Sequence, residues 1–228
     1  MSFTVPTIEW AGLAPVLIIL GAGVLGVLVE ALVPRAGRLY TQAVLSALAV
    51  LGAGAAFVMR WAQVLPQDAS TGQVVPSGSV LTPGISEDPF GVAAQGIMLV
   101  IGLLAVLVMA DRTTADDGAF AAQAADRPGS AEEAESLHAG WTGTEVFPLT
   151  LFSLGGMMLF PLSSNLIALF VMLELVSLPL YIMAAMARHR RLLSQEAALK
   201  YFVLGAFASA FLLMGAALLY GFSGSVSY

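Results

Sequence analysis

The chain has 228 residues, of which 58% are hydrophobic and 11% are charged, and its mean hydropathy is +0.88. Soluble domains carry about 25% charged residues, so this composition is typical of a membrane protein. The absence of cysteine excludes disulfides, iron–sulfur ligation and cysteine-based zinc sites within these residues. The sequence has no basic face for nucleic acid and no glycine-rich nucleotide loop. Its two histidines, His138 and His189, lie in polar loops, which argues against a buried haem or metal site.

Six apolar stretches approach or exceed the length needed to cross a membrane, because a bilayer core about 30 Å thick needs about 20 helical residues. They do not alternate between apolar and polar residues, which excludes barrel strands. The sequence therefore predicts an all-α fold, a polytopic transmembrane helix bundle with six spans. The predicted spans are Trp10–Val33, Leu39–Gln63, Phe90–Ala110, Phe147–Ser164, Leu166–Ala187 and Ser194–Gly221.

Hydrophilic linkers divide the chain into three parts. Residues 1–110 hold three N-terminal spans, residues 111–146 form an acidic linker, and residues 147–228 hold spans four to six. The acidic linker contains eight of the fifteen acidic residues, which explains the net charge of −6, and we expect its core to be disordered or weakly helical. The fourth and fifth spans are separated only by PLSSN, whose turn-forming residues predict a tight helical hairpin.

The arginines predict the orientation of the spans. Seven of the eight arginines lie in the first, third and fifth connections, and only Arg60 lies on the other side. The positive-inside rule therefore predicts that the odd connections are cytoplasmic and that both ends of the six-span segment face outward. The seven are Arg35, Arg38, Arg112, Arg127, Arg188, Arg190 and Arg191.

Glu174 is the first candidate functional residue, because eight apolar residues precede it in the fifth span. It lies roughly 12 Å from one end of the span and 20 Å from the other, too deep for a carboxylate to reach water. Ionisable groups inside a membrane are expensive, and they are functional candidates for that reason. Pro179 removes the helix bond to the carbonyl of Leu175, and a local opening beside an acid can hold water. The alternative interpretation is a hydrogen-bonded structural carboxyl.

Lys200 is the second candidate and is the only lysine in the chain. With Ser194 as the expected N-cap and Glu196 in the first turn, Lys200 lies about six residues, or roughly 9 Å, inside the sixth span. Lysine can lose its proton on burial and arginine cannot, which favours a role in proton transfer. The alternative is a lysine whose long side chain simply reaches the cytoplasmic water.

Together the two residues predict one buried relay between the fifth and sixth spans. At a separation of about 7 Å and an effective dielectric constant near 20, their attraction would be roughly 2.4 kcal/mol, enough to couple their protonation. Their depths differ by roughly 11 Å along the membrane normal. A water or a helix kink must therefore bridge them, or Lys200 must pair with a later helix instead.

Smaller side chains predict where helices approach one another. Gly155 and Gly156 give the fourth span a small face, and Gly205 and Ser209 do the same for the sixth.

Residues 147–225 closely resemble the subunit N family of bacterial NADH:quinone oxidoreductase, the respiratory complex I. The resemblance rests on LELVSLPLY around Glu174 and on EAALKYFVLGA around Lys200, and the second segment separates subunit N from the related L and M subunits. Residues 1–146 match only in helix number and in the DPFG that begins the third span. The resemblance implies an antiporter-like fold of fourteen helices, with two inverted five-helix repeats, of which this chain is the N-terminal part.

The resemblance also implies a function and partners. Glu174 would be the fifth-helix glutamate and Lys200 the sixth-helix lysine of the family's polar axis, in a membrane-arm subunit whose proton translocation is coupled to quinone reduction. Such a subunit holds no redox cofactor, since FMN, the iron–sulfur clusters and quinone belong to other subunits. The implied partners are the other membrane subunits of the bacterial inner-membrane complex, especially antiporter-like subunit M and small subunits K, J and A, together with the lipid bilayer.

Two alternatives remain open. Mrp-type sodium/proton antiporters and membrane-bound hydrogenases share this architecture, although EAALKYFVLGA argues against them. A non-transporting membrane scaffold is the other alternative, and it predicts that Glu174 and Lys200 can be neutralised without loss of pumping.

Overall fold

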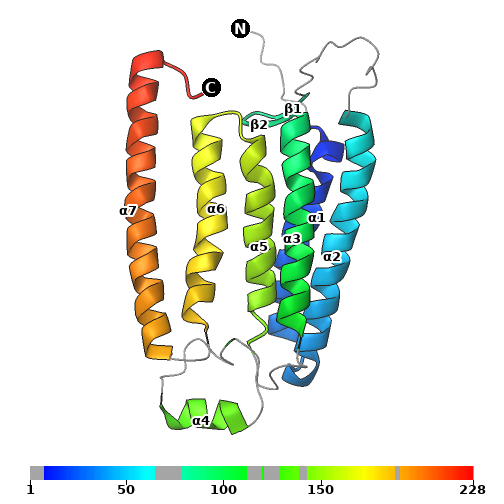
Figure 1. Cartoon of the computed structure of the whole chain (residues 1–228), viewed down its shortest axis with the longest axis vertical. Coiled ribbons are helices and arrows are strands. Elements are labelled where there is room, and N and C mark those ends of the chain that lie inside the picture. The colour runs from blue at the N-terminus through cyan, green and yellow to red at the C-terminus, as the bar shows by residue number, and fades with distance from the viewer. Residues whose placement is uncertain are drawn as a thin grey trace.

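A computed structural model describes residues 8–64, 79–111, 120, 129–138, 143–187 and 191–227. Six apolar helices in these residues run up and down beside one another, as predicted (Figure 1). Five are long and apolar enough to cross a membrane, and α5 with the 3-10 turn η1 forms a shorter apolar helix. The six are α1 (Trp10–Leu32), α2 (Arg35–Val64), α3 (Pro89–Ala110), α5 (Val146–Leu159) continued by η1 (Phe160–Leu162), α6 (Leu166–Ala185) and α7 (Arg191–Ser223).

The core lies between α1, α2, α3 and α5, whose facing side chains are apolar and almost fully buried. Phe147, Leu151, Leu154 and Met158 recur every three or four residues along α5 and therefore share the face that enters this core. Helix α7 lies at the side of the bundle, against α6 (Figure 1). Burial within the described residues is thus concentrated around α5, and α7 is the most exposed helix.

The glycines of α5 allow close approach of two backbones, as the small-residue pattern predicted. A Cβ on Gly156 would lie 2.9 Å from the backbone nitrogen of Val176 in α6. One turn earlier, Ser153 Oγ donates a hydrogen bond of 3.2 Å to the carbonyl of Val176. These contacts hold α5 against the middle of α6, close to Glu174.

A β-hairpin at one end of the bundle was not expected from the sequence. Strands β1 (Ser79–Thr82) and β2 (Ile85–Glu87) pair antiparallel around Gly84, whose φ of +92° suits glycine. The hairpin accepts backbone hydrogen bonds from Glu9 of the α1 start and from Ser164 of the α5–α6 turn. It therefore connects helices that are far apart in the sequence.

An ion pair fixes the same hairpin to α2. The guanidinium of Arg60 donates to Glu87 Oε2, with 2.7 Å between Arg60 Nε and that oxygen, and Glu87 is only 1% exposed. A buried carboxylate is tolerated here because its charge is paired and hydrogen-bonded.

Two helix starts test the expected turn chemistry. Asn165 accepts a hydrogen bond of 2.7 Å from the backbone N–H of Ala168, so the predicted α5–α6 hairpin is capped as its sequence suggests. The expected N-cap at Ser194 is wrong, because α7 begins at Arg191. Leu192 and Leu193 are good helix formers, and α7 includes them. Lys200 is therefore about 14 Å from the start of α7.

The ends of the bundle agree with alternating connections. The start of α1, the β-hairpin and the end of α7 lie at one end, and α4 (Ala131–His138), within the acidic linker, lies at the other (Figure 1). The helix matches the weakly helical expectation for part of that linker, most of which lies outside the described residues. Which end faces the cytoplasm remains a prediction.

Cysteine labelling tests this orientation, and the lack of native cysteine in these residues simplifies it. We expect an impermeant thiol reagent added from the periplasm to reach a cysteine at Ser77, which is outside the described residues, and not one at Gly129, beside α4. Labelling of Gly129→Cys alone would reverse the predicted topology.

Candidate functional site

Glu174 lies in the middle of α6 and is half-buried. Its Oε1 atom is inaccessible to solvent and has no hydrogen-bond partner among the described residues. A buried carboxylate oxygen without a donor is costly and needs a water, a proton or a further group to satisfy it. The structural-carboxyl interpretation therefore lacks the protein hydrogen bond it requires at this atom.

The groups around Glu174 define the face on which it lies. Ser177 donates its hydroxyl to the carbonyl of Leu173 at 2.8 Å. Tyr181 is seven residues from Glu174, which places both on nearly the same side of α6. The Tyr181 ring packs edge-on against Tyr201 and Phe202 of α7, with centroids 4.6 and 5.6 Å away. Glu174 therefore lies on the side of α6 that faces α7.

Pro179 lies inside α6, and the helix continues through it to Ala185. The proline ring removes a donor for the carbonyl of Leu175, as the sequence indicated, but α6 is not interrupted there. The carbonyl carbon of Leu175 would lie 3.1 Å from a Cβ on Gly156. The backbone next to Glu174 is thus held close to α5.

Lys200 lies on a different side of α7. The α6-facing side of α7 carries Ala198, Gly205 and Ser209, and Lys200 is about 200° around the helix from Ala198. Its side chain is 69% exposed, and its ammonium group pairs with Glu196 at 2.5 Å. The described residues therefore place Lys200 beside an exposed carboxylate, pointing away from α6.

The depths of the two candidates agree with the sequence-based value. Tyr181 contacts the two residues that follow Lys200, so Lys200 lies near the depth of Tyr181. Seven residues of helix separate Tyr181 from Glu174, or about 10 Å along the axis. The structure brings the helices of Glu174 and Lys200 together and leaves the two charged groups apart.

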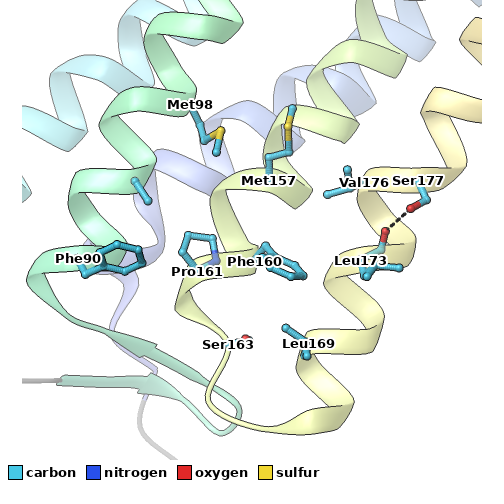
Figure 2. A pocket seen from close by; sticks show the side chains of 11 residues that line it. Phe90, Met98, Met157, Phe160, Pro161, Ser163, Leu169, Leu173, Val176 and Ser177 are labelled. Atoms are coloured by element: carbon cyan, nitrogen blue, oxygen red, sulfur yellow. Dashed lines mark hydrogen bonds between the residues drawn. The ribbon is translucent and has the colours of Figure 1, made fainter. Parts of the chain in front are cut away.

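An apolar groove lies beside α6 (Figure 2). It occupies about 670 Å³ between α3, the α5–η1 segment and α6, and Figure 2 shows aromatic and methionine side chains around it. Ser163 and Ser177 are its only hydroxyl-bearing lining residues, and Glu174 does not line it. The groove is suited to apolar groups, and its lining includes Ser177, which lies one turn after Glu174 on α6.

Sequence reasoning missed a polar cluster at the α4 end of the bundle. Glu30 accepts hydrogen bonds from Gln42 Nε2 at 2.9 Å and from Arg38 Nη1 at 3.4 Å. Arg38 Nε donates to the carbonyl of Val33 at 2.7 Å. These residues come from α1, α2 and the turn between them, and Glu145 at the start of α5 adds a second carboxylate. The Glu30–Arg38 spacing of eight residues across a helix break gave no periodic signal.

The charges of this cluster shift the pKa of Glu145. Partial desolvation raises the pKa of Glu145, the negative charge of Glu30 raises it further, and the positive charge of Arg38 opposes both. A carboxyl with a raised pKa contributes stability below the ordinary glutamate pKa, and this contribution is lost as the pH rises through the raised value.

In the wild type, stability should therefore fall as the pH rises from below the ordinary glutamate pKa. Glu145→Gln should reduce this fall, because glutamine does not ionise. The measurement is the unfolding temperature of the purified complex against pH. Glu132→Gln is the matched control, because a hydrogen bond from the Ser130 side chain lowers the pKa of Glu132 and its effect must have the opposite sign. Parallel profiles for wild type and Glu145→Gln would contradict this assignment.

The described residues contain no group of three or more histidine, aspartate and glutamate side chains that could hold a metal ion. Their ionisable groups are dispersed, and they include Glu174, the Lys200–Glu196 and Arg60–Glu87 pairs and the Glu30–Arg38–Glu145 cluster.

Comparisons with known proteins agree with this architecture. Residues 163–228 match the family model of the NADH:quinone oxidoreductase/Mrp antiporter transmembrane region. The chain is 50% identical to NADH-quinone oxidoreductase subunit N of Beutenbergia cavernae and 49% identical to that of Acidothermus cellulolyticus. These alignments cover 100% and 98% of this chain but only 43% and 41% of the relatives, so the chain spans about two fifths of their length.

Solved structures show the same fold. Respiratory complex I from Thermus thermophilus with bound aureothin matches with a TM-score of 0.63 and 26% identity, over 93% of this chain and 38% of that chain. An archaeal membrane-bound sulfane sulfur reductase matches with a TM-score of 0.60 over 95% of this chain and 28% of that chain, at 17% identity, which shows the fold alone. The chain belongs to the subunit N family of the NADH-quinone oxidoreductases, within the antiporter-like membrane subunits.

Proposed function

We propose that this chain is part of a membrane-arm subunit of a proton-pumping NADH:quinone oxidoreductase, in which Glu174 and Lys200 belong to one path of proton translocation coupled to quinone reduction. The observation that carries the proposal is the Glu174 Oε1 atom, buried within an apolar helix and without a partner among the described residues. A carboxyl group in this position can exchange a proton with a neighbouring water, and the exchange requires little change in structure.

The side of α6 that carries Glu174 has hydroxyl groups nearby that can bind such a water. Ser209 is buried on the α6-facing side of α7, and it lies within about one helical turn of the depth of Glu174. The Tyr181 hydroxyl approaches Gly205 on the same interface. Hydroxyl groups both donate and accept hydrogen bonds, so Tyr181 and Ser209 can hold water beside the carboxyl.

Lys200 would take part in the path on the side of α7 that faces away from α6. Because it points away from α6, it is suited to exchange with a group on another helix, and its ammonium group pairs with Glu196 on α7. The exposed pair also favours the competing interpretation that Lys200 only anchors α7 at the membrane surface.

Lys200→Met should lower the number of protons translocated per NADH oxidised, with a smaller effect than neutralising Glu174, because Lys200 is nearer to cytoplasmic water. Lys200→Arg is the matched control for charge, since arginine anchors equally well and does not release its proton. A proton path therefore predicts loss in both variants, measured in membrane vesicles with assembly checked on native gels. Normal pumping by Lys200→Arg would leave only the anchoring role.

The proposed partners are the other membrane subunits of the complex, including antiporter-like subunit M and small subunits K, J and A, in the bacterial inner membrane. No redox cofactor is assigned to this chain in the proposal. Affinity purification of the tagged subunit should recover NADH dehydrogenase activity. Recovery of sodium/proton antiporter or hydrogenase subunits in its place would favour the other members of this architecture.

A further inference from the structure

We propose that Glu30 and Glu145, with Gln42 and Ser46, form a second, hydrated proton-binding site at the α4 end of the bundle, between α1, α2 and α5. The site would bind one proton between the two carboxylates and at least one internal water beneath them. It lies on helices other than those of Glu174 and Lys200, and it does not depend on the path proposed for them.

Gln42 is the centre of the site. It is 0% exposed, and its Nε2 donates to the carbonyl of Gly26 at 2.8 Å and to Glu30 Oε1 at 2.9 Å. Both partners are acceptors, which fixes the amide orientation with its oxygen on the other side. That oxygen, Gln42 Oε1, is buried and has no donor among the described residues. Every buried acceptor of this kind requires a donor, and a water is the ordinary one.

Ser46 supplies the second polar atom. It lies one turn further into the membrane on the same buried face of α2, and it is also 0% exposed. Ser177 and Thr41 donate their hydroxyls to the carbonyl four residues earlier, but Ser46 Oγ has no partner among the described residues. Residues four apart on a helix have Cβ atoms about 5–6 Å apart. In the proposed site, a water between the two residues donates one hydrogen bond to Gln42 Oε1 and one to Ser46 Oγ.

Gly26 of α1 packs closely against the buried oxygen of Gln42 and against α5. A Cβ on Gly26 would lie 3.0 Å from Gln42 Oε1 and 3.1 Å from the Cβ of Pro148 in α5. Gln42 thus lies between α1 and the first turn of α5, which follows Glu145. The glycine allows the amide to reach this depth.

The charges of the site favour one bound proton. Glu30, Glu145 and Arg38 together carry a net charge of −1 when both carboxylates are ionised, and none when one carboxylate is protonated. The charges that act on Glu145 among the described residues are those of Glu30 and Arg38. Arg35 and Asp111 lie at the same end of the bundle, and each has an interaction of its own. A neutral cluster is the less costly state at a membrane boundary.

Infrared spectroscopy of the assembled complex tests the proton. The carbonyl stretch of protonated carboxyl groups is followed through a pH titration. Wild type should show a protonated-carboxyl band that persists above the ordinary glutamate range and that is absent from the Glu145→Gln spectrum. Glu30→Gln should move its titration to lower pH, because a like charge is lost, and Arg38→Gln should move it to higher pH.

The controls separate this site from Glu174 and from a purely structural cluster. Glu132→Gln, in the exposed helix α4, should leave the band unchanged, and so should Glu174→Gln, whatever its effect on pumping. The proposal is overturned if Glu145→Gln leaves the band in place, or if the titration is the same in Glu30→Gln and Arg38→Gln. A high-resolution map of the complex tests the water: density between Gln42 Oε1 and Ser46 Oγ supports the site, and a protein donor on Gln42 Oε1 contradicts it.

Discussion

Gly156→Ala is expected to destabilise the subunit by about 1–3 kcal/mol, the usual cost of forcing an extra carbon into a packed interface. The new Cβ would lie 2.9 Å from the backbone nitrogen and from a methyl of Val176, and 3.1 Å from the carbonyl carbon of Leu175. Backbone atoms of α6 cannot rotate out of the way as a side chain can. Helices α5 and α6 must therefore separate, and this would also displace the segment that carries Glu174.

The neighbouring glycine provides a matched control. A Cβ on Gly155 would meet only the side chain of Leu20 at its nearest contacts, and this side chain can adopt another rotamer. Both substitutions replace glycine by alanine within a helix and gain the same helix propensity. The difference between their effects on stability therefore reports the different contacts of the two new Cβ atoms. The measurement is the unfolding temperature and the amount of assembled complex on native gels. Unchanged stability of Gly156→Ala relative to wild type would show that α5 and α6 are not in backbone contact in the assembled protein.

Glu174→Gln is expected to cause the largest functional loss. Glutamine keeps the shape of the side chain and removes the titration, so assembly should be retained. A positioned proton acceptor typically contributes 10²–10⁴-fold to a rate, and the proton flux through this subunit should fall by about that factor. Pumping by the whole complex would fall only by the share that this subunit carries.

The measurement is the ratio of protons translocated to NADH oxidised in sealed vesicles. Glu9→Gln is the matched control, because Glu9 is an exposed carboxylate at the start of α1 and should be neutral to pumping. Glu174→Asp should recover part of the flux, since it restores a titratable group on a shorter side chain. An unchanged ratio in Glu174→Gln would favour the scaffold interpretation.

Hydropathy was sufficient to predict the helices, because six long apolar segments have no alternative in a membrane except helical hydrogen bonding. The close-packing glycines and the Asn165 turn were also readable, since both are local signals. The β-hairpin was not, because β1 and β2 are only four and three residues long and their linker has no strand periodicity. Ser194 was mistaken for the helix start because a good capping residue does not act as a cap when the preceding residues also favour helix.

Candidate site residues were predictable only where depth alone made them unusual. Glu174 was identified in this way, and its lack of a partner among the described residues is consistent with that reasoning. The direction of Lys200 depends on which face of α7 packs on α6, which the sequence of one helix does not specify. The contact between Gln42 and Glu30 was missed because it arises only when α1 packs on α2.

The central claim is that Glu174 and Lys200 act in one proton path, and a double-mutant comparison tests it most directly. Protons translocated per NADH oxidised are measured for Glu174→Gln, Lys200→Met and the combined variant, in complexes of equal assembly. Two groups in series predict that the combined variant loses no more than Glu174→Gln alone, because one blocked step already stops the path. Additive losses in the combined variant, or pumping at the wild-type ratio in all three, would contradict the account.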